Sequence, residues 1–458
     1  MSIEYRVQNP VNNEVVEKFD HATDQEIQDT IAKATEAFQS WRKTSYAERR
    51  EILSKAADIL RERRAELAKI SAEEMGKATP QGEWEINFSA DIIQFYADRA
   101  EKHNADTPIE NIDGGKAVMR RLPLGPILGI MPWNYPFYQV ARFAGPNLMN
   151  GNTVILKHAE ICPKSSAAIA DIFTEAGLPE GCFNNVYATH DQISTIIEDP
   201  RVQGVSLTGS ERAGAAVAAQ AGKALKKCVL ELGGTDAYII LDAADVKKAA
   251  ADAWEKRIEN VGQACTSNKR IIVMSDIYDE FVDEMVRIAE SFTEGNPLEP
   301  GENEYYPMSS RDAAEKLDEQ VKKAVSAGAN LRTGGELHEK GAYFTPAVLT
   351  DVPVGSESYY EEFFGPVAEI YSVNSEEEAI ELANNSNYGL GGAVFSEDEE
   401  RAKKVADKVE TGMIHVNLGQ AFSPALPFGG IKNSGFGREL SPLAMDEFVN
   451  KQTFYVND

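Results

Sequence analysis

The amino-acid sequence predicts a protein of the α/β class, built on parallel sheets with helices between the strands. From Pro126 onward, stretches of helical periodicity alternate with short apolar runs at residues 127–131, 153–157, 183–187, 202–208 and 228–232. Such alternation is typical of parallel sheets with right-handed crossovers. At 458 residues the chain is also too long for one ordinary core, so we expect two or three domains.

The same patterns give the remaining elements in chain order. Residues 5–19 predict a hairpin, residues 23–101 predict helices, and residues 101–116, with Asp113-Gly114-Gly115, predict a turn-rich connection. Further helices are predicted from Pro163 and at 191–198, 210–226, 245–260, 276–292 and 312–327. Further strands are predicted at 238–241, 270–274, 368–372, 392–395 and 413–417. The closing run 447–456 alternates like a strand but has no obvious partner in its own chain, which allows pairing with a second subunit.

The bulk composition argues against several classes of partner and site. The net charge of −27 would repel nucleic acids and anionic membranes. No run approaches the ~20 apolar residues of a membrane span, and no secretory segment follows Met1. The four cysteines have no C-x-x-C spacing and the six histidines form no cluster. We therefore expect reduced thiols, a cytoplasmic location and no metal site.

Residues 261–270, which contain Cys265, are the segment on which the predicted chemistry centres. The cysteine lies between a predicted helix and a predicted buried strand, at a break marked by Gly262. Loops in such places often carry chemistry, because a backbone turn can aim N–H groups at the atom that a thiol attacks. On position alone, a small buried structural cysteine is the more common case.

A second candidate is the junction at Gly209 and Ser210. The sequence has no G-x-G-x-x-G fingerprint, but here a predicted strand ends at Gly209 and a helix begins with Ser210 as its N-cap. Free N–H groups and the positive end of the helix dipole would face a phosphate. A plain capped helix start explains the same residues equally well.

Eight segments in order resemble the aldehyde dehydrogenase family along almost the whole chain. They are Met131-Pro-Trp-Asn-Tyr-Pro136, Gly145-Pro-Asn-Leu148, Lys157-His-Ala-Glu160, Leu207-Thr-Gly-Ser210, Leu230-Glu-Leu-Gly-Gly234, Gly262-Gln-Ala-Cys265, Glu362-Phe-Phe-Gly-Pro-Val367 and Pro427-Phe-Gly-Gly-Ile-Lys-Asn-Ser-Gly-Phe-Gly-Arg-Glu439. Within the family, the sequence is most similar to the short bacterial succinate-semialdehyde dehydrogenases.

The resemblance implies a division of the chain into three parts. They are a Rossmann-type cofactor domain of residues 1–102 and 123–233, an α/β catalytic domain of residues 234–432 with the nucleophilic cysteine, and a small oligomerisation element of residues 103–122 and 433–458. A homodimer or homotetramer follows from that last element.

The resemblance also implies catalytic roles. Cys265 matches the nucleophile that attacks the aldehyde carbon, and Asn134 matches the amide that binds the developing oxyanion together with the Cys265 backbone N–H. Glu231 matches the general base that activates the water for thioester hydrolysis. Lys157 matches a residue that is expected to be both catalytic and cofactor-binding.

For the cofactor, the resemblance implies NAD, with NADP as the alternative. Lys157 and Glu160 match residues at the adenosine ribose, where a carboxylate would accept hydrogen bonds from both hydroxyls and repel a 2′-phosphate. Gly209 and Ser210 are expected to contact the pyrophosphate, and Trp133 is expected to contact the adenine half. Glu362 and Phe364 are expected to contact the nicotinamide ribose and ring. Thr235 and His158 depart from the family, which commonly has lysine and proline at these positions.

Arg142 carries the expectation about the substrate. By resemblance it lines the substrate tunnel and grips the distal carboxylate of succinate semialdehyde, with Ser423 adding a hydroxyl contact and Tyr138 and Phe422 adding aromatic walls. A structural ion-pair partner is the plainer reading of Arg142. The alternatives in function are specificity for glutarate semialdehyde or small aliphatic aldehydes, a cofactor-independent thiol esterase, and a non-catalytic protein on the same fold.

Overall fold

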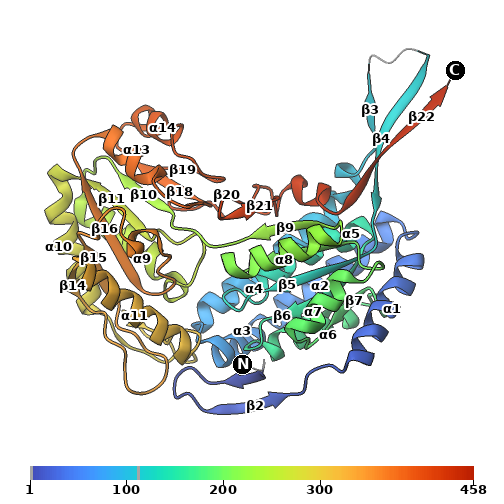
Figure 1. Cartoon of the computed structure of the whole chain (residues 1–458), viewed down its shortest axis with the longest axis horizontal. Coiled ribbons are helices and arrows are strands. Elements are labelled where there is room, and N and C mark those ends of the chain that lie inside the picture. Colours follow the sequence, from blue (N-terminus) through green and yellow to red (C-terminus); the bar gives the residue numbers. More distant parts are fainter. Residues whose placement is uncertain (1–3, 111–113, 458) are drawn as a thin grey trace.

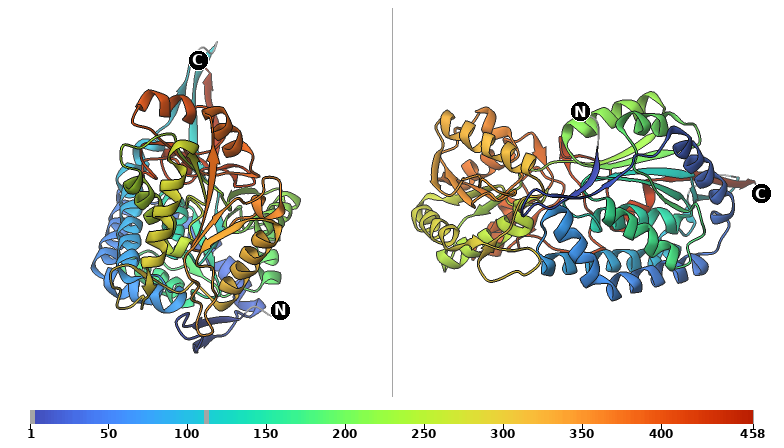
Figure 2. Two further views of the ribbon diagram at one scale, coloured as in Figure 1. Left: turned by 90° about the vertical axis from the view of Figure 1, so that its left-hand side faces the viewer. Right: turned by 90° about the horizontal axis from the view of Figure 1, so that it is seen from below.

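The computed structural model describes residues 4–110 and 114–457, so the predictions that involve Met1 and Asp113 lie outside the described residues. Two α/β bodies lie side by side, and a narrow arm of three strands projects from one of them (Figure 1). The views in Figure 2 show that the arm leaves the body that contains the N-terminal helices. Among the described residues, no helix is long and apolar enough to cross a membrane.

The N-terminal part of the chain forms a hairpin and four helices. Strands β1 (Tyr5–Gln8) and β2 (Val15–Phe19) pair antiparallel, as predicted. The helices are α1 (Asp24–Trp41), α2 (Tyr46–Glu62), α3 (Arg64–Met75) and α4 (Thr79–His103). Capping boxes at Thr23 and Ser45 satisfy the first N–H groups of α1 and α2. The buried faces of these helices join one core with α5 and α6.

The first body is organised by a six-stranded sheet with the order β21-β9-β8-β5-β6-β7. Its strands are β5 (Pro126–Met131), β6 (Thr153–His158), β7 (Phe183–Asn185), β8 (Gly204–Thr208), β9 (Lys227–Glu231) and β21 (Gly435–Phe436). The connecting helices are α5 (Tyr138–Asn150), α6 (Pro163–Glu175), α7 (His190–Glu198) and α8 (Glu211–Lys223). All pairs are parallel except that of β21.

Strand order in this sheet reverses between β5 and β8. From β5 the chain runs outward to β6 and β7, and then returns to the other side of β5 for β8 and β9. This is the order of a dinucleotide-binding sheet, in which ligands bind beyond the carboxyl ends of the strands at the reversal. The segments that follow β5 and β8 begin at Pro132 and Gly209, both within the motifs singled out above.

The second body holds a seven-stranded sheet with the order β14-β15-β16-β11-β10-β18-β19. These strands are β10 (Ala237–Ile240), β11 (Arg270–Met274), β14 (Asn330–Thr333), β15 (Ala347–Thr350), β16 (Val367–Val373), β18 (Gly392–Phe395) and β19 (His415–Val416). Its helices are α9 (Val246–Ile258), α10 (Ser275–Ser291), α11 (Arg311–Ala327), α12 (Glu357–Tyr360), α13 (Glu376–Asn384) and α14 (Glu399–Ala406). Short pairs complete the body: β12 (Thr293–Glu294) with β13 (Glu304–Tyr305), and β17 (Tyr388–Gly389) with β20 (Ile431–Lys432).

The arm consists of β3 (Thr107–Ile109), β4 (Gly115–Pro123) and β22 (Val449–Asn457). The prediction that the C-terminal run lacks a partner in its own chain is wrong, because β22 pairs antiparallel with β4 from Val449 to Asn457. Its partner begins inside a segment that looked turn-rich in the sequence.

The predicted third part of the chain begins at residue 433, but the residues that follow do not enter the arm directly. Strand β21 extends the six-stranded sheet, and the short 3-10 helix η2 (Pro442–Asp446) packs against α4 and α5. The Tyr96 hydroxyl donates to the Ser441 carbonyl oxygen over 3.1 Å. Of the described residues after 433, only those from Val449 onward lie in the arm.

Candidate active site

Cys265 lies at the end of a strained turn between α9 and β11. The 3-10 turn η1 (Glu259–Gly262) contains Asn260 and Val261 at φ 50° and 57°, followed by Gly262 at 70°. A left-handed conformation is unusual for a β-branched residue such as valine, so the surrounding contacts must hold the turn. A Cβ on Gly262 would lie 2.2 Å from the Gly365 carbonyl oxygen. The turn therefore requires glycine here on two counts.

Arg257 is the contact that fixes this turn to the neighbouring loop. Its buried guanidinium donates to the Gly262 carbonyl oxygen at 3.2 Å, and to the Phe363 and Gly365 carbonyl oxygens at 2.8 and 2.6 Å. It also donates to the Ser267 hydroxyl at 2.8 Å. Arg257 thus joins the loop of Cys265 to the loop of Glu362 and Phe364. A planar guanidinium can do this because it presents several N–H donors in fixed directions.

Asn134 is brought against the same turn from the end of β5. Its side-chain amide nitrogen donates to the Gln263 carbonyl oxygen at 3.0 Å, and its backbone carbonyl oxygen accepts from the Asn260 side chain at 2.9 Å. An amide nitrogen has two hydrogens, and this bond uses one of them. The second hydrogen is available to an oxyanion, which is the role expected for Asn134.

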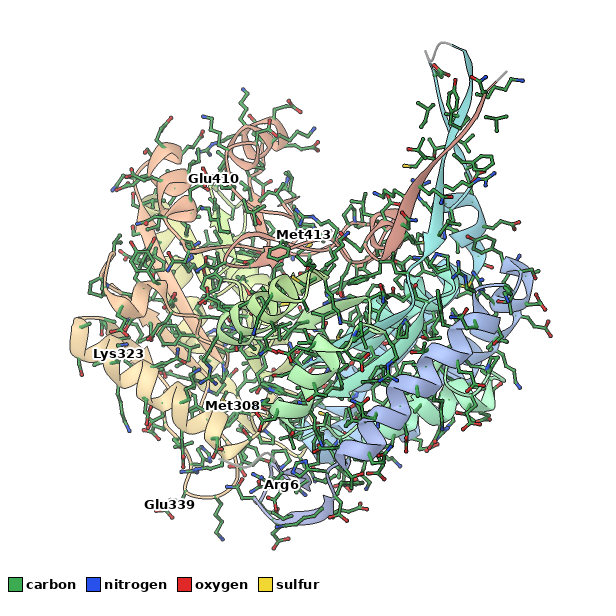
Figure 3. The ribbon with its side chains drawn as sticks, turned by 45° about the vertical axis from the view of Figure 1, so that its right-hand side comes forward. Arg6, Met308, Lys323, Glu339, Glu410 and Met413 are labelled. Atoms are coloured by element: carbon green, nitrogen blue, oxygen red, sulfur yellow. The ribbon has the colours of Figure 1, made fainter. Side chains whose placement is uncertain are left out.

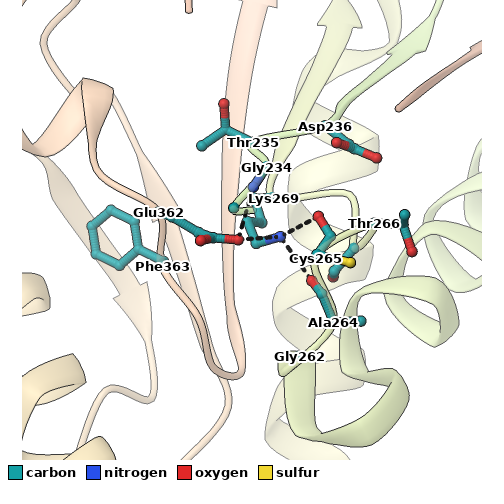
Figure 4. Close-up of polar contacts among 12 residues, drawn as sticks. Gly234, Thr235, Asp236, Gly262, Ala264, Cys265, Thr266, Lys269, Glu362 and Phe363 are labelled. Carbon is teal, nitrogen blue, oxygen red and sulfur yellow. Dashed lines mark hydrogen bonds and ion pairs between the residues drawn. The ribbon is translucent and has the colours of Figure 1, made fainter. Parts of the chain in front are cut away.

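Around Cys265 itself, Lys269 is the main polar neighbour (Figure 4). The Lys269 ammonium donates to the Ala264 and Cys265 carbonyl oxygens at 2.8 and 2.9 Å, and it pairs with Glu362 at 3.0 Å. Burial raises the pKa of the Cys265 thiol to about 11, although Arg142 and Lys269 act to lower it. The thiol is therefore protonated at neutral pH in this state, and it needs a base to become a nucleophile.

Glu231 is the residue expected to activate water for the later hydrolysis of the thioester. It ends β9, is almost fully buried, and neither of its carboxylate oxygens has a hydrogen-bond partner among the described residues. Burial raises the pKa of Glu231 well above its usual value, and the nearby Glu439 adds to the rise while Arg142 opposes it. A carboxyl group with a raised pKa binds a proton more tightly than an ordinary carboxylate, which suits a general base.

The paired glycines after Glu231 allow the two bodies to approach each other. A Cβ on Gly234 would lie 2.7 Å from the Cys265 carbonyl oxygen, and one on Gly233 would lie 2.5 Å from the Glu362 carboxylate. The Gly234 N–H donates to that carboxylate over 3.1 Å. Only glycines permit this proximity.

The cofactor contacts expected at the reversal of strand order are arranged around β6 and β8. Ser210 is exposed and caps α8, its hydroxyl accepting from the Ala213 N–H at 3.4 Å. A Cβ on Gly209 would meet nothing closer than 3.6 Å, and the buried Thr208 hydroxyl has no partner among the described residues. This open space, the unpartnered hydroxyl and the helix N-terminus fit a bound pyrophosphate.

Lys157 and Glu160 lie at the end of β6 and form an ion pair with each other. Burial acts to raise the pKa of Glu160, but Lys157 outweighs it and the pKa is lowered. The carboxylate is therefore charged at neutral pH and suits ribose hydroxyls as hydrogen-bond donors. Lys157 lies at the adenosine end of the crevice with Glu160, and the structure gives it no contact with Cys265.

Trp133 requires a correction. It was expected at the adenine half of the cofactor and Phe364 at the nicotinamide ring, but the two rings contact edge to face with their centroids 5.7 Å apart. Opposite ends of a dinucleotide cannot lie at one ring contact. Since Phe364 neighbours Glu362 and Lys269, which reach Cys265, Trp133 belongs to the same end of the crevice.

A cavity of about 450 Å³ lies beside this centre and holds three of the four expected substrate residues. Tyr138, Phe422 and Ser423 line it, together with Phe88, Met413 and other residues of the loop before Pro427. Figure 3 labels Met413, which lies just before β19 of the second body.

Arg142 is the fourth expected residue, and it is not on the cavity wall. Its guanidinium is fully buried, pairs with Glu439 at 2.7 Å, and donates to the Tyr138 hydroxyl at 3.2 Å. The contact of Arg142 with a substrate carboxylate stays a prediction, while the pair with Glu439 supports the plainer reading as a structural ion-pair partner. Its influence on the cavity passes through Tyr138.

Sequence reasoning missed Lys269, Arg257 and the partner of His158. The first two are basic residues close to Cys265 in the sequence, and that proximity was the available signal. His158 bonds to the Pro136 carbonyl oxygen at 2.9 Å, a contact across 22 residues that no local pattern reveals. Thr235 hydrogen-bonds with the Ser386 hydroxyl at 2.8 Å.

The geometry thus combines a dinucleotide-type sheet with a cysteine, an amide and a buried carboxyl at its edge, which defines a thiol-dependent dehydrogenase. The family model described as the aldehyde dehydrogenase family matches residues 2–454, and the chain belongs to that family. The resemblance predicted from the motifs is confirmed, and the chain is an enzyme that oxidises aldehydes with a nicotinamide dinucleotide.

Several relatives are similar over nearly their whole length. A succinate-semialdehyde dehydrogenase [NADP(+)] of Deinococcus radiodurans is 45% identical, covering 97% of this chain and 93% of the relative. A probable enzyme of the same name from Synechocystis is 41% identical over 98% of both chains. The crystal structure of succinic semialdehyde dehydrogenase from Streptococcus pyogenes with NADP+ is 44% identical, with a TM-score of 0.96, covering 99% of this chain and 100% of that one.

Proposed function

We propose that this enzyme oxidises succinate semialdehyde to succinate. The observation that carries the proposal is the wall of the cavity, where Tyr138 accepts an N–H from Arg142 and so keeps its own hydroxyl proton for a substrate carboxylate. Ser423 offers a second hydroxyl on the same wall. The names of the similar enzymes from Deinococcus and Synechocystis support the same substrate.

In the proposed mechanism, the Cys265 thiol gives its proton to solvent and the thiolate sulfur attacks the aldehyde carbon. The oxygen becomes an oxyanion that accepts hydrogen bonds from the Asn134 amide and the Cys265 backbone N–H. A nicotinamide dinucleotide held at Glu362 and Phe364 would supply the hydride acceptor that takes the substrate carbon from the aldehyde to the thioester oxidation level. Glu231 then takes a proton from water, the hydroxide adds to the thioester, and the carboxylic acid leaves as the sulfur regains a proton.

The substrate assignment is tested by comparing succinate semialdehyde with butanal, which has the same chain length and no carboxylate. We expect kcat/KM to favour succinate semialdehyde by about thirtyfold or more, the size of an interaction with a charged group of about 2 kcal/mol. Tyr138→Phe keeps the ring and should lose much of that preference while butanal is unaffected. Equal kcat/KM values in the wild type would overturn the assignment and leave the family assignment intact.

Glutarate semialdehyde is the nearest competing substrate, because it carries the same carboxylate on a longer chain. The same assay with this aldehyde decides between them: the lower kcat/KM identifies the poorer fit to the 450 Å³ cavity. A cofactor-independent esterase is disfavoured by the crevice at Gly209 and Glu160. An enzyme that hydrolysed esters but did not oxidise aldehydes would support the esterase alternative.

For the cofactor, we propose a preference for NAD over NADP. The support is the charged Glu160 carboxylate, which would repel a 2′-phosphate at the ribose. The relatives named above carry NADP(+) in their names, which supports the opposite preference, so the cofactor is decided by measurement. Glu160→Ser should shift the ratio of kcat/KM values toward NADP by at least tenfold. An unchanged ratio would remove Glu160 as the cause, and a wild-type preference for NADP would contradict the proposal.

We also propose that the arm joins subunits. Strand β22 is an edge strand in the described part of the chain, and Phe454 and Val456 are exposed along it. A long edge strand with apolar side chains is a template for a further chain. The cytoplasmic location expected from the sequence stays a prediction.

A further inference from the structure

The N-terminal end of α4 contacts the two segments that carry the oxyanion site, at the end of the Asn134 loop and in the turn before Cys265. Glu85 lies in its second turn and is fully buried. One of its carboxylate oxygens accepts from the Phe137 and Tyr138 backbone N–H groups at 2.8 and 3.0 Å. These residues directly follow the Pro132–Pro136 loop that carries Asn134, so the carboxylate holds the end of that loop at the start of α5.

The other Glu85 oxygen forms an ion pair with Lys77, which is also fully buried. The Lys77 ammonium lies 3.7 Å from the centre of the Tyr135 ring, the neighbour of Asn134 in sequence. A cation over an aromatic face is attracted to it, more strongly in a buried place. Lys77 therefore contacts Tyr135, next to Asn134, and Glu85 holds the residues that directly follow the loop.

The same helix end also reaches the cysteine turn. The Gln81 side chain accepts from the Asn260 backbone N–H at 3.2 Å. Asn260 in turn donates to the Asn134 carbonyl oxygen, and the Tyr135 hydroxyl donates to Glu259 at 3.1 Å. The position of Asn134 relative to the cysteine turn is thus set by contacts that converge on α4.

We propose that Glu85, supported by Lys77, is a positioning residue for the Asn134 amide in the oxyanion site. This role rests on the proposed function of Asn134. Burying a charged pair is costly unless both partners are fully hydrogen-bonded, and this pair is best explained by what it holds. Small misplacement of a catalytic group lowers the rate of the chemical step by large factors.

The test compares two double variants that both lack the ion pair. Lys77→Met with Glu85→Gln keeps an acceptor for the Phe137 and Tyr138 N–H groups, whereas Lys77→Met with Glu85→Leu removes it. We expect the glutamine variant to keep kcat within about threefold of wild type, and the leucine variant to lose about tenfold or more in kcat with KM nearly unchanged. Thermal unfolding shows that each variant is folded at the assay temperature. If the leucine variant does not fold, Lys77→Met with Glu85→Ala takes its place, because it also removes the acceptor and fits in the same space.

Each comparison is repeated with Asn134→Ala. If Glu85 acts through Asn134, the glutamine and leucine variants have the same kcat once the amide is gone. A leucine effect that persists without Asn134 overturns the positioning role alone. If Asn134→Ala leaves kcat unchanged, the proposed oxyanion function fails and the positioning role fails with it, so the two failures are distinguishable.

Glu74 provides the matched control. It is an equally buried carboxylate at a helix start, accepting from the Lys164 and Ser165 N–H groups of α6 at 2.6 and 3.1 Å. It does not contact the Asn134 loop in the described structure. Glu74→Gln should change the unfolding temperature and leave kcat at saturating cofactor within about twofold. A kcat loss equal to that of the Glu85→Leu double variant would show that any buried carboxylate in this region has the same effect.

Discussion

His158 shows how one side chain can fix a catalytic loop from a distance. Its Nδ1 accepts from the Ala159 N–H at 2.8 Å, so the ring must carry its proton on Nε2, which donates to the Pro136 carbonyl oxygen. Protonating Nδ1 would break the first bond. Burial accordingly lowers the pKa of His158 to about 4, and Lys157 adds to the shift.

The depressed pKa of His158 gives a prediction about stability and pH. Above pH 6.5 the ring is neutral in folded and unfolded chains alike, and its contribution is fully present. As the pH falls from 6.5 toward 4, the unfolded chain binds a proton that the folded chain does not, and stability is lost, on the order of 2 kcal/mol at pH 5. We expect the unfolding temperature of the wild type to fall more between pH 7 and pH 5 than that of His158→Gln. Identical falls would show that His158 does not titrate in this way.

At the scale of elements, the short turn η1 is strained, because it holds three consecutive residues at positive φ. Gly262→Ala would place a methyl group 2.2 Å from the Gly365 carbonyl oxygen at a φ of 70°. We predict a loss of about 2 kcal/mol or more in stability and at least a tenfold loss in kcat, since the turn places Cys265. Urea unfolding and steady-state kinetics check both effects.

Gly222→Ala is the control for that substitution. This glycine lies within α8, where an added Cβ would meet nothing within 4 Å. Alanine is favoured over glycine in a helix, so stability should stay equal or rise by up to about 1 kcal/mol, with kcat unchanged. Equal losses in the two variants would contradict the role given to the turn.

At the same scale, the sequence predicted the elements well where apolar periodicity is local. Residues 270–274 form β11 as predicted, and the predicted helix at 245–260 is α9. The predicted strand at 413–417 shrinks to His415 and Val416, since the sheet partner β18 aligns with only those two residues. The partner of β22 could not be predicted, because antiparallel pairing between strands more than 300 residues apart leaves no local pattern.

The candidate site was predictable only where motifs name single residues. Asn134 contacts the turn that precedes Cys265, as their motifs implied, while the catalytic role of Glu231 stays a prediction. The orientation of Arg142 depended on Glu439, almost 300 residues away, and a buried ion pair of that kind cannot be read from either segment alone. For the same reason, the contact of Trp133 with Phe364 appeared only in the folded chain.

At the scale of the whole molecule, the arm gives a prediction about assembly. Removing residues 449–458 deletes β22 and leaves β4 with only β3 as a partner. We expect the truncated chain to form smaller assemblies than the wild type, as measured by light scattering during size-exclusion chromatography. The same assembly mass in both chains would show that the arm does not join subunits.

The most direct measurement for the enzyme as a whole is rapid mixing of Glu231→Gln with succinate semialdehyde and saturating NAD. If Cys265 forms a thioester that Glu231 helps to hydrolyse, reduced cofactor should appear in a fast burst, with up to one equivalent per active site, and steady turnover should fall by at least a hundredfold. Mass spectrometry of the quenched protein should find the acyl group on Cys265. A variant that turns over at the wild-type rate, or a burst with no acylated Cys265, would contradict the covalent mechanism.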